Sequence, residues 1–372
     1  MMKETLGIIL VQERFNAMRE LTMHRTIASV PFGGRYRLID FTLSSLVNSG
    51  VREVGISTRS NFYSLMDHIG SGKIWDLNRK KGGLTVFPQS GSITGSLAGA
   101  SKVETLYSML DYIKRSRAKY VLVCDSNIVG NIDYNKLLEY HIEKHAYLTV
   151  AYQKDVFDPS RFHGNAFLET DENGRVIDVT IDQGIQLHSK MALGIYIIER
   201  ELLEFLISQC MAHNKLDFER NILQEMADDL DIYGWCCDEY VEKVDSIETF
   251  HNANMALLDP DIRNDLFMGD KIYTKVRDEM PTQHGENAIV ENSMIADGCI
   301  IEGTVENSII FRSVKVGKGA VIRNSIIMQS SEIGEDAIVE NCITDKNVVI
   351  SNGMKIVGAP NYPLVIAKGS KI

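Results

Sequence analysis

Two segments carry the side chains best placed for chemistry, and each follows an apolar run that predicts a buried strand. Residues Gln12–Arg19 follow Leu6–Val11, and Asp125 follows Tyr120–Val123. Ligands of open α/β sheets bind beyond the carboxyl ends of the strands, so both segments are predicted to line one cleft. Glycine amides and basic side chains would cradle phosphate there, but Gln12–Arg19 contains no glycine. An aspartate at 125 could hold a metal ion or cap a turn, and the residues alone leave both interpretations open.

Alternating strands and helices are predicted to position these segments. Continuously apolar runs alternate with helical patterns through the first two-thirds of the chain. This alternation is typical of an open, mostly parallel, Rossmann-like sheet with helices on both faces. We predict strands over 6–11, 52–57, 120–123, 148–153 and 191–198, and helices over 36–49, 60–69, 104–114, 134–144, 201–210 and 217–230.

A different repeat occupies the last part of the chain. The motif Glu-Asn-Ser-Ile-Ile, or a close variant, starts at residues 291, 306, 323 and 340, and apolar residues recur every six positions. Six residues per side and about three sides per coil predict a left-handed parallel β-helix, whereas a generic β-sandwich gives no reason for this period. We therefore predict an α/β domain over 1–258, a linker over 259–287 and a β-helix over 288–372.

Length, charge and cysteine content limit the class of protein. A chain of 372 residues fits two domains better than one core. The net charge of −11 disfavours nucleic acid and anionic membranes as partners. The six cysteines form neither a CxxC pair nor a zinc pattern, which fits a reducing compartment. Without a signal-peptide pattern or an apolar run of about 18 residues, we expect a cytoplasmic protein that does not span a membrane.

The segment PFGGRYRLIDF at 31–41, with TLSSLVNSGV after it, resembles the start of bacterial glucose-1-phosphate adenylyltransferases, also called ADP-glucose pyrophosphorylases. ALGIYII at 192–198, IETFHNANMALL at 247–258 and IYTK at 272–275 extend the resemblance over nearly the whole chain. The resemblance implies a nucleotidyltransferase-like domain followed by a β-helix, and assembly into tetramers. Members of this family make ADP-glucose from ATP and glucose 1-phosphate, on the route to glycogen or starch.

The resemblance also implies a phosphate loop, and this chain departs from it. The family's loop reads approximately GGxGTRLxPLTxxRAKPAVPFGG. When the loop is aligned on Leu21-Thr22 and Arg25, its first three glycines, the arginine after its first threonine and its lysine all fall on other residue types here. The degenerate positions are Gln12, Glu13, Phe15, Ala17 and Ile27. The positions kept as substrate-binding remnants are Arg14, Arg25 and Gly194.

Further departures concern the metal and the sugar phosphate. The family's first metal aspartate matches Asp125, and its second carboxylate is replaced by Ala256. The family's YWxDVGT reads here with Lys243 where an aspartate would lie. The sugar-phosphate motif EKP is absent, with Lys190 near its place but out of register, and GTADAV becomes Ser101–Leu106.

Together these departures resemble the non-catalytic, GlgD-type subunit that accompanies the catalytic one in some bacteria. We expect a regulatory subunit, inactive alone, that forms a mixed tetramer with a catalytic glucose-1-phosphate adenylyltransferase. No cofactor is expected to be required, and Mg²⁺ would be needed only if activity remains. A sugar phosphate or nucleotide is the expected kind of effector. Three alternatives stay open: a divergent active enzyme, a sensor without turnover and a purely architectural subunit.

Overall fold

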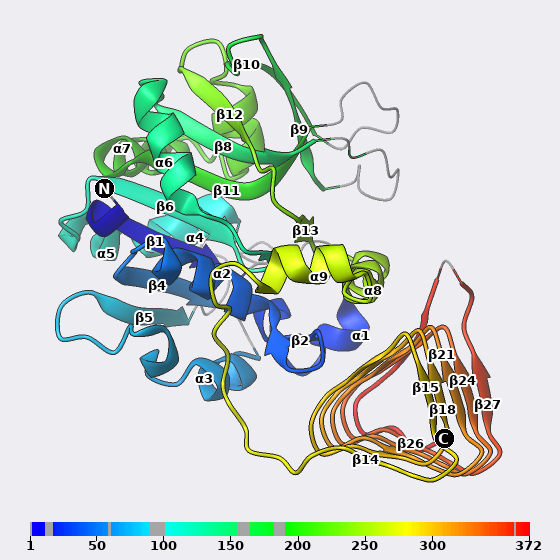
Figure 1. The fold of residues 1–372 in the computed structure, drawn as a ribbon. Coiled ribbons are helices and arrows are strands. Elements are labelled where there is room, and N and C mark those ends of the chain that lie inside the picture. The colour runs from blue at the N-terminus through cyan, green and yellow to red at the C-terminus, as the bar shows by residue number, and fades with distance from the viewer. Residues whose placement is uncertain are drawn as a thin grey trace.

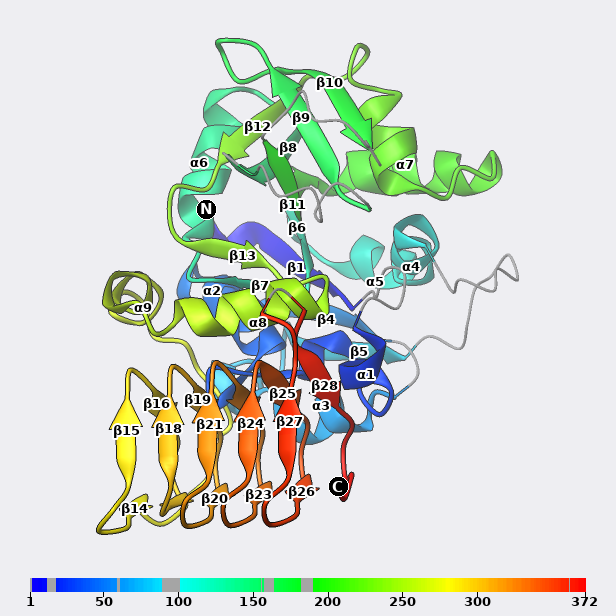
Figure 2. The ribbon, with the colours of Figure 1, turned by 90° about the vertical axis from the view of Figure 1, so that its right-hand side faces the viewer.

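A computed structural model describes residues 2–11, 18–58, 61–88, 101–154, 156, 164–181, 190–360 and 362–372. An α/β domain is followed by a triangular β-helix, and the two pack side by side (Figures 1 and 2). Within the described part of the chain, no helix is both long enough and apolar enough to cross a membrane. All six cysteines are free thiols.

A nine-stranded sheet forms the centre of the α/β domain, with the main order β10-β9-β11-β6-β1-β4-β5 and with β8 and β12 joined beside β11. The bounds are β1 (Thr5–Leu10), β4 (Glu53–Thr58), β5 (Gly83–Pro88), β6 (Tyr120–Asp125), β8 (Leu148–Gln153), β9 (Ala166–Thr170), β10 (Val176–Ile181), β11 (Met191–Glu199) and β12 (Ile232–Cys236). Strands β5, β4, β1 and β6 are parallel, as predicted, and β11 runs antiparallel to β6 and β8. The parallel strands and the antiparallel strands show the same continuously apolar pattern in sequence, because both kinds are buried on two faces of the sheet.

Helices cover this sheet (Figure 1). They are α1 (Arg19–Thr22), α2 (Leu38–Asn48), α3 (Tyr63–Ile69), α4 (Lys102–Ser108), α5 (Leu110–Arg115), α6 (Tyr134–Glu143), α7 (Arg200–Ala212), α8 (Ile247–Ala256) and α9 (Pro260–Phe267), with a π-helix, η5 (Glu219–Gln224), and 3₁₀ turns η1 (Met2–Glu4), η2 (Ile27–Ser29) and η3 (Lys73–Trp75). The helix predicted over 104–114 is two helices, because the backbone leaves helical geometry at Met109. Two small ladders, β2 (Pro31–Phe32) with β3 (Tyr36–Arg37) and β7 (Ile128–Gly130) with β13 (Val241–Lys243), complete the domain.

Three five-stranded parallel sheets form the faces of the β-helix (Figure 2). One contains β14 (Gln283–His284), β17 (Ile300–Ile301), β20 (Lys315–Val316), β23 (Glu332–Ile333) and β26 (Val349–Ile350); the second β15 (Ile289–Glu291), β18 (Thr304–Glu306), β21 (Val321–Arg323), β24 (Ile338–Glu340) and β27 (Lys355–Val357); the third β16 (Met294–Ile295), β19 (Ile309–Ile310), β22 (Ile326–Ile327), β25 (Cys342–Thr344) and β28 (Leu364–Ile366). The predicted left-handed β-helix is confirmed. Its first strand, β14, lies within the segment predicted as a linker, which also contains α9.

The repeated Asn-Ser-Ile-Ile motif has a physical explanation. Each asparagine turns a corner with positive φ, at +45° for Asn307 and +47° for Asn324, a conformation that asparagine tolerates well. The following serines form a ladder, in which Ser308 Oγ accepts a hydrogen bond from the Ser325 amide at 3.1 Å. The two isoleucines then point to opposite faces of the strand, since side chains alternate along it.

That alternation also joins the two domains. The second isoleucine of the motif, such as Ile310 or Ile327, fills the interior of the β-helix. The first, such as Ile309 or Ile326, belongs to the apolar core that contains Phe32 of the α/β domain. Burying one such side chain contributes roughly 1.5–3 kcal/mol, so a single motif stabilises both the β-helix and its docking.

Candidate functional site

Asp125 ends the central strand β6 at the predicted mouth of the cleft. It lies in register with Leu10, the last residue of β1. Its side chain is only 9% exposed. A carboxylate buried to this degree needs a partner of opposite charge or several hydrogen bonds.

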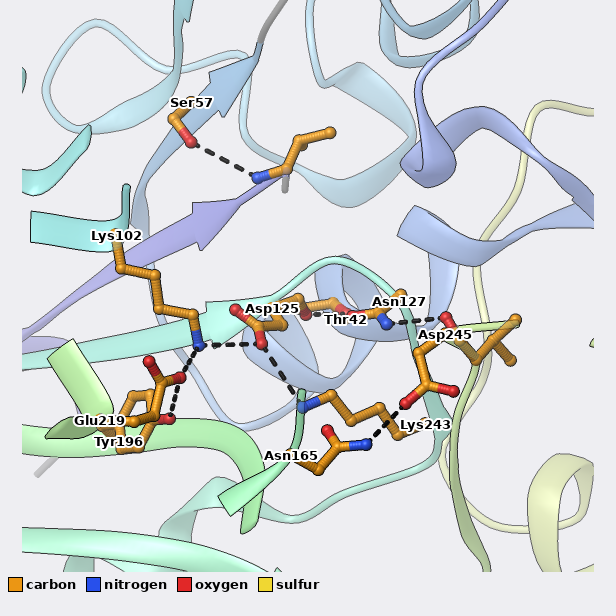
Figure 3. A network of polar contacts seen from close by, with 12 residues as sticks. Thr42, Ser57, Lys102, Asp125, Asn127, Asn165, Tyr196, Glu219, Lys243 and Asp245 are labelled. Carbon is orange, nitrogen blue, oxygen red and sulfur yellow. Dashed lines mark hydrogen bonds and ion pairs between the residues drawn. The ribbon is translucent and has the colours of Figure 1, made fainter. Parts of the chain in front are cut away.

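Two lysines supply those partners (Figure 3). Lys102 Nζ lies 3.0 Å from Asp125 Oδ2, and Lys243 Nζ lies 3.9 Å from the same oxygen. Lys102 Nζ also lies 2.8 Å from Oε1 of Glu219. These four buried residues, Asp125, Lys102, Lys243 and Glu219, form what we call the charge quartet.

Local structure fixes Lys102 in this place. It is the first residue of α4, and Ser101 caps that helix by accepting a hydrogen bond from the Glu104 amide at 3.1 Å. The Glu104 carboxylate in turn accepts one from the Ser101 amide at 2.8 Å, which completes a capping box. On the other side, the Tyr196 hydroxyl donates to Glu219 Oε1 at 3.1 Å.

Lys243 reaches Asp125 from β13. That strand pairs with β7, where Lys243 is in register with Ile128. Asn127 holds the next residue from two directions: its Nδ2 donates to the Val244 carbonyl at 2.7 Å, and its carbonyl accepts from the Val244 amide at 2.9 Å. The turn after Asp125 is therefore tied to the strand that carries Lys243.

Gly194 leaves the space that the Asp125 carboxylate occupies. A Cβ atom built at Gly194 would lie 2.1 Å from Asp125 Oδ2, and the backbone there has φ +76°. Only glycine adopts this conformation without strain, and only glycine avoids the clash. This predicted remnant therefore belongs to the quartet's immediate surroundings, and a part in substrate binding stays a prediction.

The residues around Asp125 do not fit Mg²⁺, which the family resemblance implies. Mg²⁺ binds carboxylate, carbonyl and water oxygens. Here two ammonium groups approach the one carboxylate oxygen (Figure 3). Two like unit charges 4 Å apart repel by about 4 kcal/mol at an effective dielectric constant near 20, and a divalent ion doubles that. In the described ranges, no cluster of three or more His, Cys, Asp or Glu side chains could hold a metal ion.

The other predicted site residues have varied positions. Gln12, Glu13, Arg14, Phe15 and Ala17 lie outside the described residues. Ile27 begins the 3₁₀ turn η2 and is buried in the apolar core. Ala256 is half-buried at the end of helix α8. Ala256 and Lys243 are the two positions where a family aspartate is replaced, and of these it is Lys243 that contacts Asp125.

Arg25, a predicted substrate-binding remnant, is held by the β-helix. Its Nη2 atom lies 2.8 Å from each carboxylate oxygen of Asp345. The two side chains are 3% and 2% exposed. This buried ion pair joins the α/β domain to the β-helix, and a role for Arg25 in substrate binding stays a prediction.

A second candidate site lies between the α/β domain and the β-helix. It is a cavity, open to solvent, that six basic side chains line together with one carboxylate, Glu279. The basic residues are Arg35, Arg37, Lys275, Arg277, Arg312 and Lys346. We call this cavity the interdomain basic pocket. Its charge suits an anion with several negative oxygens.

The electrostatics of the pocket favour an added anion. Arg312 is 5% exposed, and its Nε atom lies 3.9 Å from Oδ2 of Asp297, an ion pair without a hydrogen bond. Within the described part of the chain, its Nε and Nη2 atoms have no hydrogen-bond partner. Burial, with the positive charges of Arg37 and Arg25, lowers the pKa of Lys346 from 10.5 to about 7. Burial also lowers the pKa of Arg37 to about 10. An anion here would complete hydrogen bonds and relieve repulsion among the cations.

Sequence reasoning missed several residues of both sites. Lys102 stood in a degraded motif, which suggested loss rather than a new partner for Asp125. Glu219 carried no signal, because a glutamate in a helical pattern reads as solvent-exposed. Arg312 and Lys346 lie on loops of the β-helix, and only its docking brings them to Arg37. The repeat units that contain Arg312 and Lys346 are otherwise ordinary in composition.

Comparisons with known proteins agree with this architecture. Residues 7–259 match the family model "Nucleotidyl transferase", and residues 278–361 match "GlmU-like, C-terminal hexapeptide". The "Glycogen biosynthesis protein GlgD" of Geobacillus stearothermophilus is 38% identical over 87% of this chain and 84% of its own length. The protein of that name from Bacillus subtilis (strain 168) is 36% identical over 98% and 96%. A "Glucose-1-phosphate adenylyltransferase" of Clostridium novyi (strain NT) is 32% identical over 86% and 84%.

Proposed function

This chain belongs to the nucleotidyl transferase family, in the group of glucose-1-phosphate adenylyltransferases and GlgD proteins, and from this membership we propose that it is a regulatory subunit of glycogen biosynthesis. It makes no ADP-glucose alone and changes the activity of a catalytic glucose-1-phosphate adenylyltransferase with which it assembles, as a mixed tetramer in the cytoplasm.

The charge quartet is the observation that carries the proposal. Nucleotidyl transfer develops negative charge on phosphate oxygens, which a bound cation must neutralise. Asp125 is the expected anchor for that cation, and Lys102 and Lys243 already neutralise it. An ammonium can itself bind phosphate, but Lys102 is 4% exposed and also pairs with Glu219, so its charge is taken up within the protein.

Regulation by such a subunit has a simple physical route. A partner has an active and a less active conformation, and this chain packs better against one of them. The difference in packing free energy shifts the partner's population, and a ligand bound to this chain changes that difference. Surfaces of the β-helix and of the helices over the sheet are the ones we assign to the contact.

The interdomain basic pocket supports a sensing part of this role. Its buried, incompletely bonded Arg312 and its crowded cations suit a sugar phosphate or a nucleotide. Because residues from both domains line it, a bound anion would change how firmly the β-helix docks on the α/β domain. Such a change reaches the surfaces that a partner contacts.

One assay tests the regulatory function. ADP-glucose formation is measured for this chain alone, for the catalytic homologue alone, and for the two co-expressed, with size-exclusion chromatography to establish the mixed assembly. We expect no product from this chain alone, and a changed kcat per catalytic subunit or a changed effector response in the mixture. Mg²⁺-dependent synthesis by this chain alone would overturn the proposal. A mixed assembly with unchanged kinetics would leave an architectural subunit.

The sensing role is tested by thermal unfolding of this chain with glucose 1-phosphate, ADP and inorganic phosphate as probes. Chloride at matched ionic strength is the control. A ligand that binds only the folded state raises the midpoint in a concentration-dependent way. We expect the phosphate-bearing probes to raise the midpoint above the chloride control, and equal midpoints would remove the sensing role.

A further inference from the structure

The net charge of the charge quartet bears on metal binding. Asp125 and Glu219 each carry one negative charge when ionised, and Lys102 and Lys243 each carry one positive charge, so the four cancel. We propose that the ammonium groups of Lys243 and Lys102 replace a divalent cation at Asp125, so that these four side chains are neutral together without metal and Lys243 determines whether metal can bind. The proposal deepens the function proposed above and rests on it.

The position of Lys243 is the first argument. Of the two positions where the resemblance led us to expect an aspartate, this one lies beside Asp125, with its Nζ atom 3.9 Å from Oδ2. An aspartate at 243 would make two carboxylates that face each other from β6 and β13, and their two negative charges would match one divalent ion. With lysine at 243, the covalently attached cation lies where that ion would be needed.

The state of Asp125 is the second argument. Its Oδ2 atom receives both ammonium groups, whereas its buried Oδ1 atom has no hydrogen-bond partner among the residues that the structure describes. An ammonium group pairs with a single carboxylate oxygen, so the two lysines leave the acceptor capacity of Oδ1 unused. Gly194 leaves the space that the carboxylate itself occupies. Asp125 thus keeps one unused oxygen, while two lysines supply positive charge at the other.

The experiment uses the full chain, with Mn²⁺ as the probe because its binding can be followed by electron paramagnetic resonance. The central variant is Lys243→Asp, which removes a positive charge and adds an oxygen ligand. The matched control is Lys243→Met, which removes the same charge and adds no ligand. Lys102→Thr combined with Lys243→Asp removes the remaining repulsion, and threonine is the residue that the family motif GTADAV has at this position.

We expect the wild-type chain to show no saturable Mn²⁺ binding that depends on Asp125, so Asp125→Asn leaves its titration unchanged. We expect Lys243→Asp to bind Mn²⁺ at least tenfold more tightly than the wild type and the Lys243→Met control. Adding Asp125→Asn to Lys243→Asp should abolish that gain. The midpoint of thermal unfolding of Lys243→Asp should rise with Mn²⁺ more than that of Lys243→Met.

Two results would overturn the proposal. One is wild-type binding of Mn²⁺ that Asp125→Asn abolishes, which needs no folded charge-reversal variant. The other is a folded Lys243→Asp chain, as judged by circular dichroism, that binds Mn²⁺ no better than Lys243→Met. Either result can be told apart from a failure of the proposed function, because regulation of a catalytic partner is measured separately, with the wild-type chain, as kcat per catalytic subunit.

Discussion

Arg25 and Asp345 are 320 positions apart in sequence and form an ion pair in which one guanidinium nitrogen lies 2.8 Å from both carboxylate oxygens. Since both side chains are buried, neither can turn to water if the other is removed. The pair therefore makes docking of the β-helix on the α/β domain depend on one arginine of the segment in which the family carries its phosphate loop.

Arg25→Met should destabilise the protein by about 3–5 kcal/mol, because it leaves the buried Asp345 carboxylate without its partner. Urea unfolding followed by circular dichroism measures the change. The double variant Arg25→Met/Asp345→Leu should recover part of the loss, since it removes both charges. If the double variant were as unstable as the sum of its single variants, the pair would contribute through packing rather than charge.

Lys102→Met should also cost about 3–5 kcal/mol, because two buried carboxylates, on Asp125 and Glu219, then lose their shared cation. The control is Lys315→Met on the surface of the β-helix, where Lys315 pairs with Glu332 at 2.8 Å with both side chains exposed. An exposed pair contributes at most about 1 kcal/mol. Equal losses of unfolding free energy for the two variants would show that the quartet is well solvated.

Gly194→Ala tests the space that the quartet occupies. Alanine with positive φ costs roughly 1–2 kcal/mol at any site. Gly369, with φ +74°, has open space where a Cβ atom would be, so Gly369→Ala measures this backbone cost alone. At Gly194 the new methyl group also meets the Asp125 carboxylate, so we expect a clearly larger loss of unfolding free energy. Similar losses at the two sites would mean that the carboxylate moves aside freely.

The lowered pKa of Lys346 predicts how the free energy of unfolding depends on pH. Its pKa is about 7 in the folded protein, lowered by burial and by Arg37 and Arg25, although Asp345 opposes the shift. Between pH 7 and 10.5 the unfolded chain therefore binds more protons at this lysine than the folded chain, and the free energy of unfolding rises with pH. Denaturant unfolding from about pH 6 to pH 9 should show a steeper rise for the wild type than for Lys346→Met. Parallel curves would contradict the lowered pKa.

Arg312→Gln tests the interdomain basic pocket. We expect this variant to lose most of the thermal stabilisation that phosphate-bearing probes give the wild type, since it removes a buried guanidinium with unfilled hydrogen-bonding capacity. Arg323→Gln is the matched control, because the Arg323 side chain is exposed at the end of strand β21 and pairs with Glu306 at 2.6 Å. Stabilisation that survives in Arg312→Gln and falls in Arg323→Gln would move the anion site out of the pocket.

The sequence predicted the elements of the fold that local residue patterns determine. Leu148–Gln153 was predicted with its observed bounds, and the period of six predicted the β-helix. The partners of Asp125 were beyond such reasoning, because β13 is three residues long and shows no usable periodicity. A lysine in such a segment reads as solvent-exposed. Likewise, Arg312 and Arg37 approach the same pocket only because two separately patterned domains dock.

The cancelling charges of the quartet also determine what single substitutions toward a metal site would do to the protein. A first mutation from Lys243 to aspartate changes the buried sum from 0 to −2, and one from Lys102 to threonine changes it to −1. Either intermediate is less stable than the present protein unless a metal ion arrives at once, and the phosphate loop would still be missing. Metal binding and stability are therefore coupled in either intermediate, because the ion would supply the positive charge that the lysine supplied.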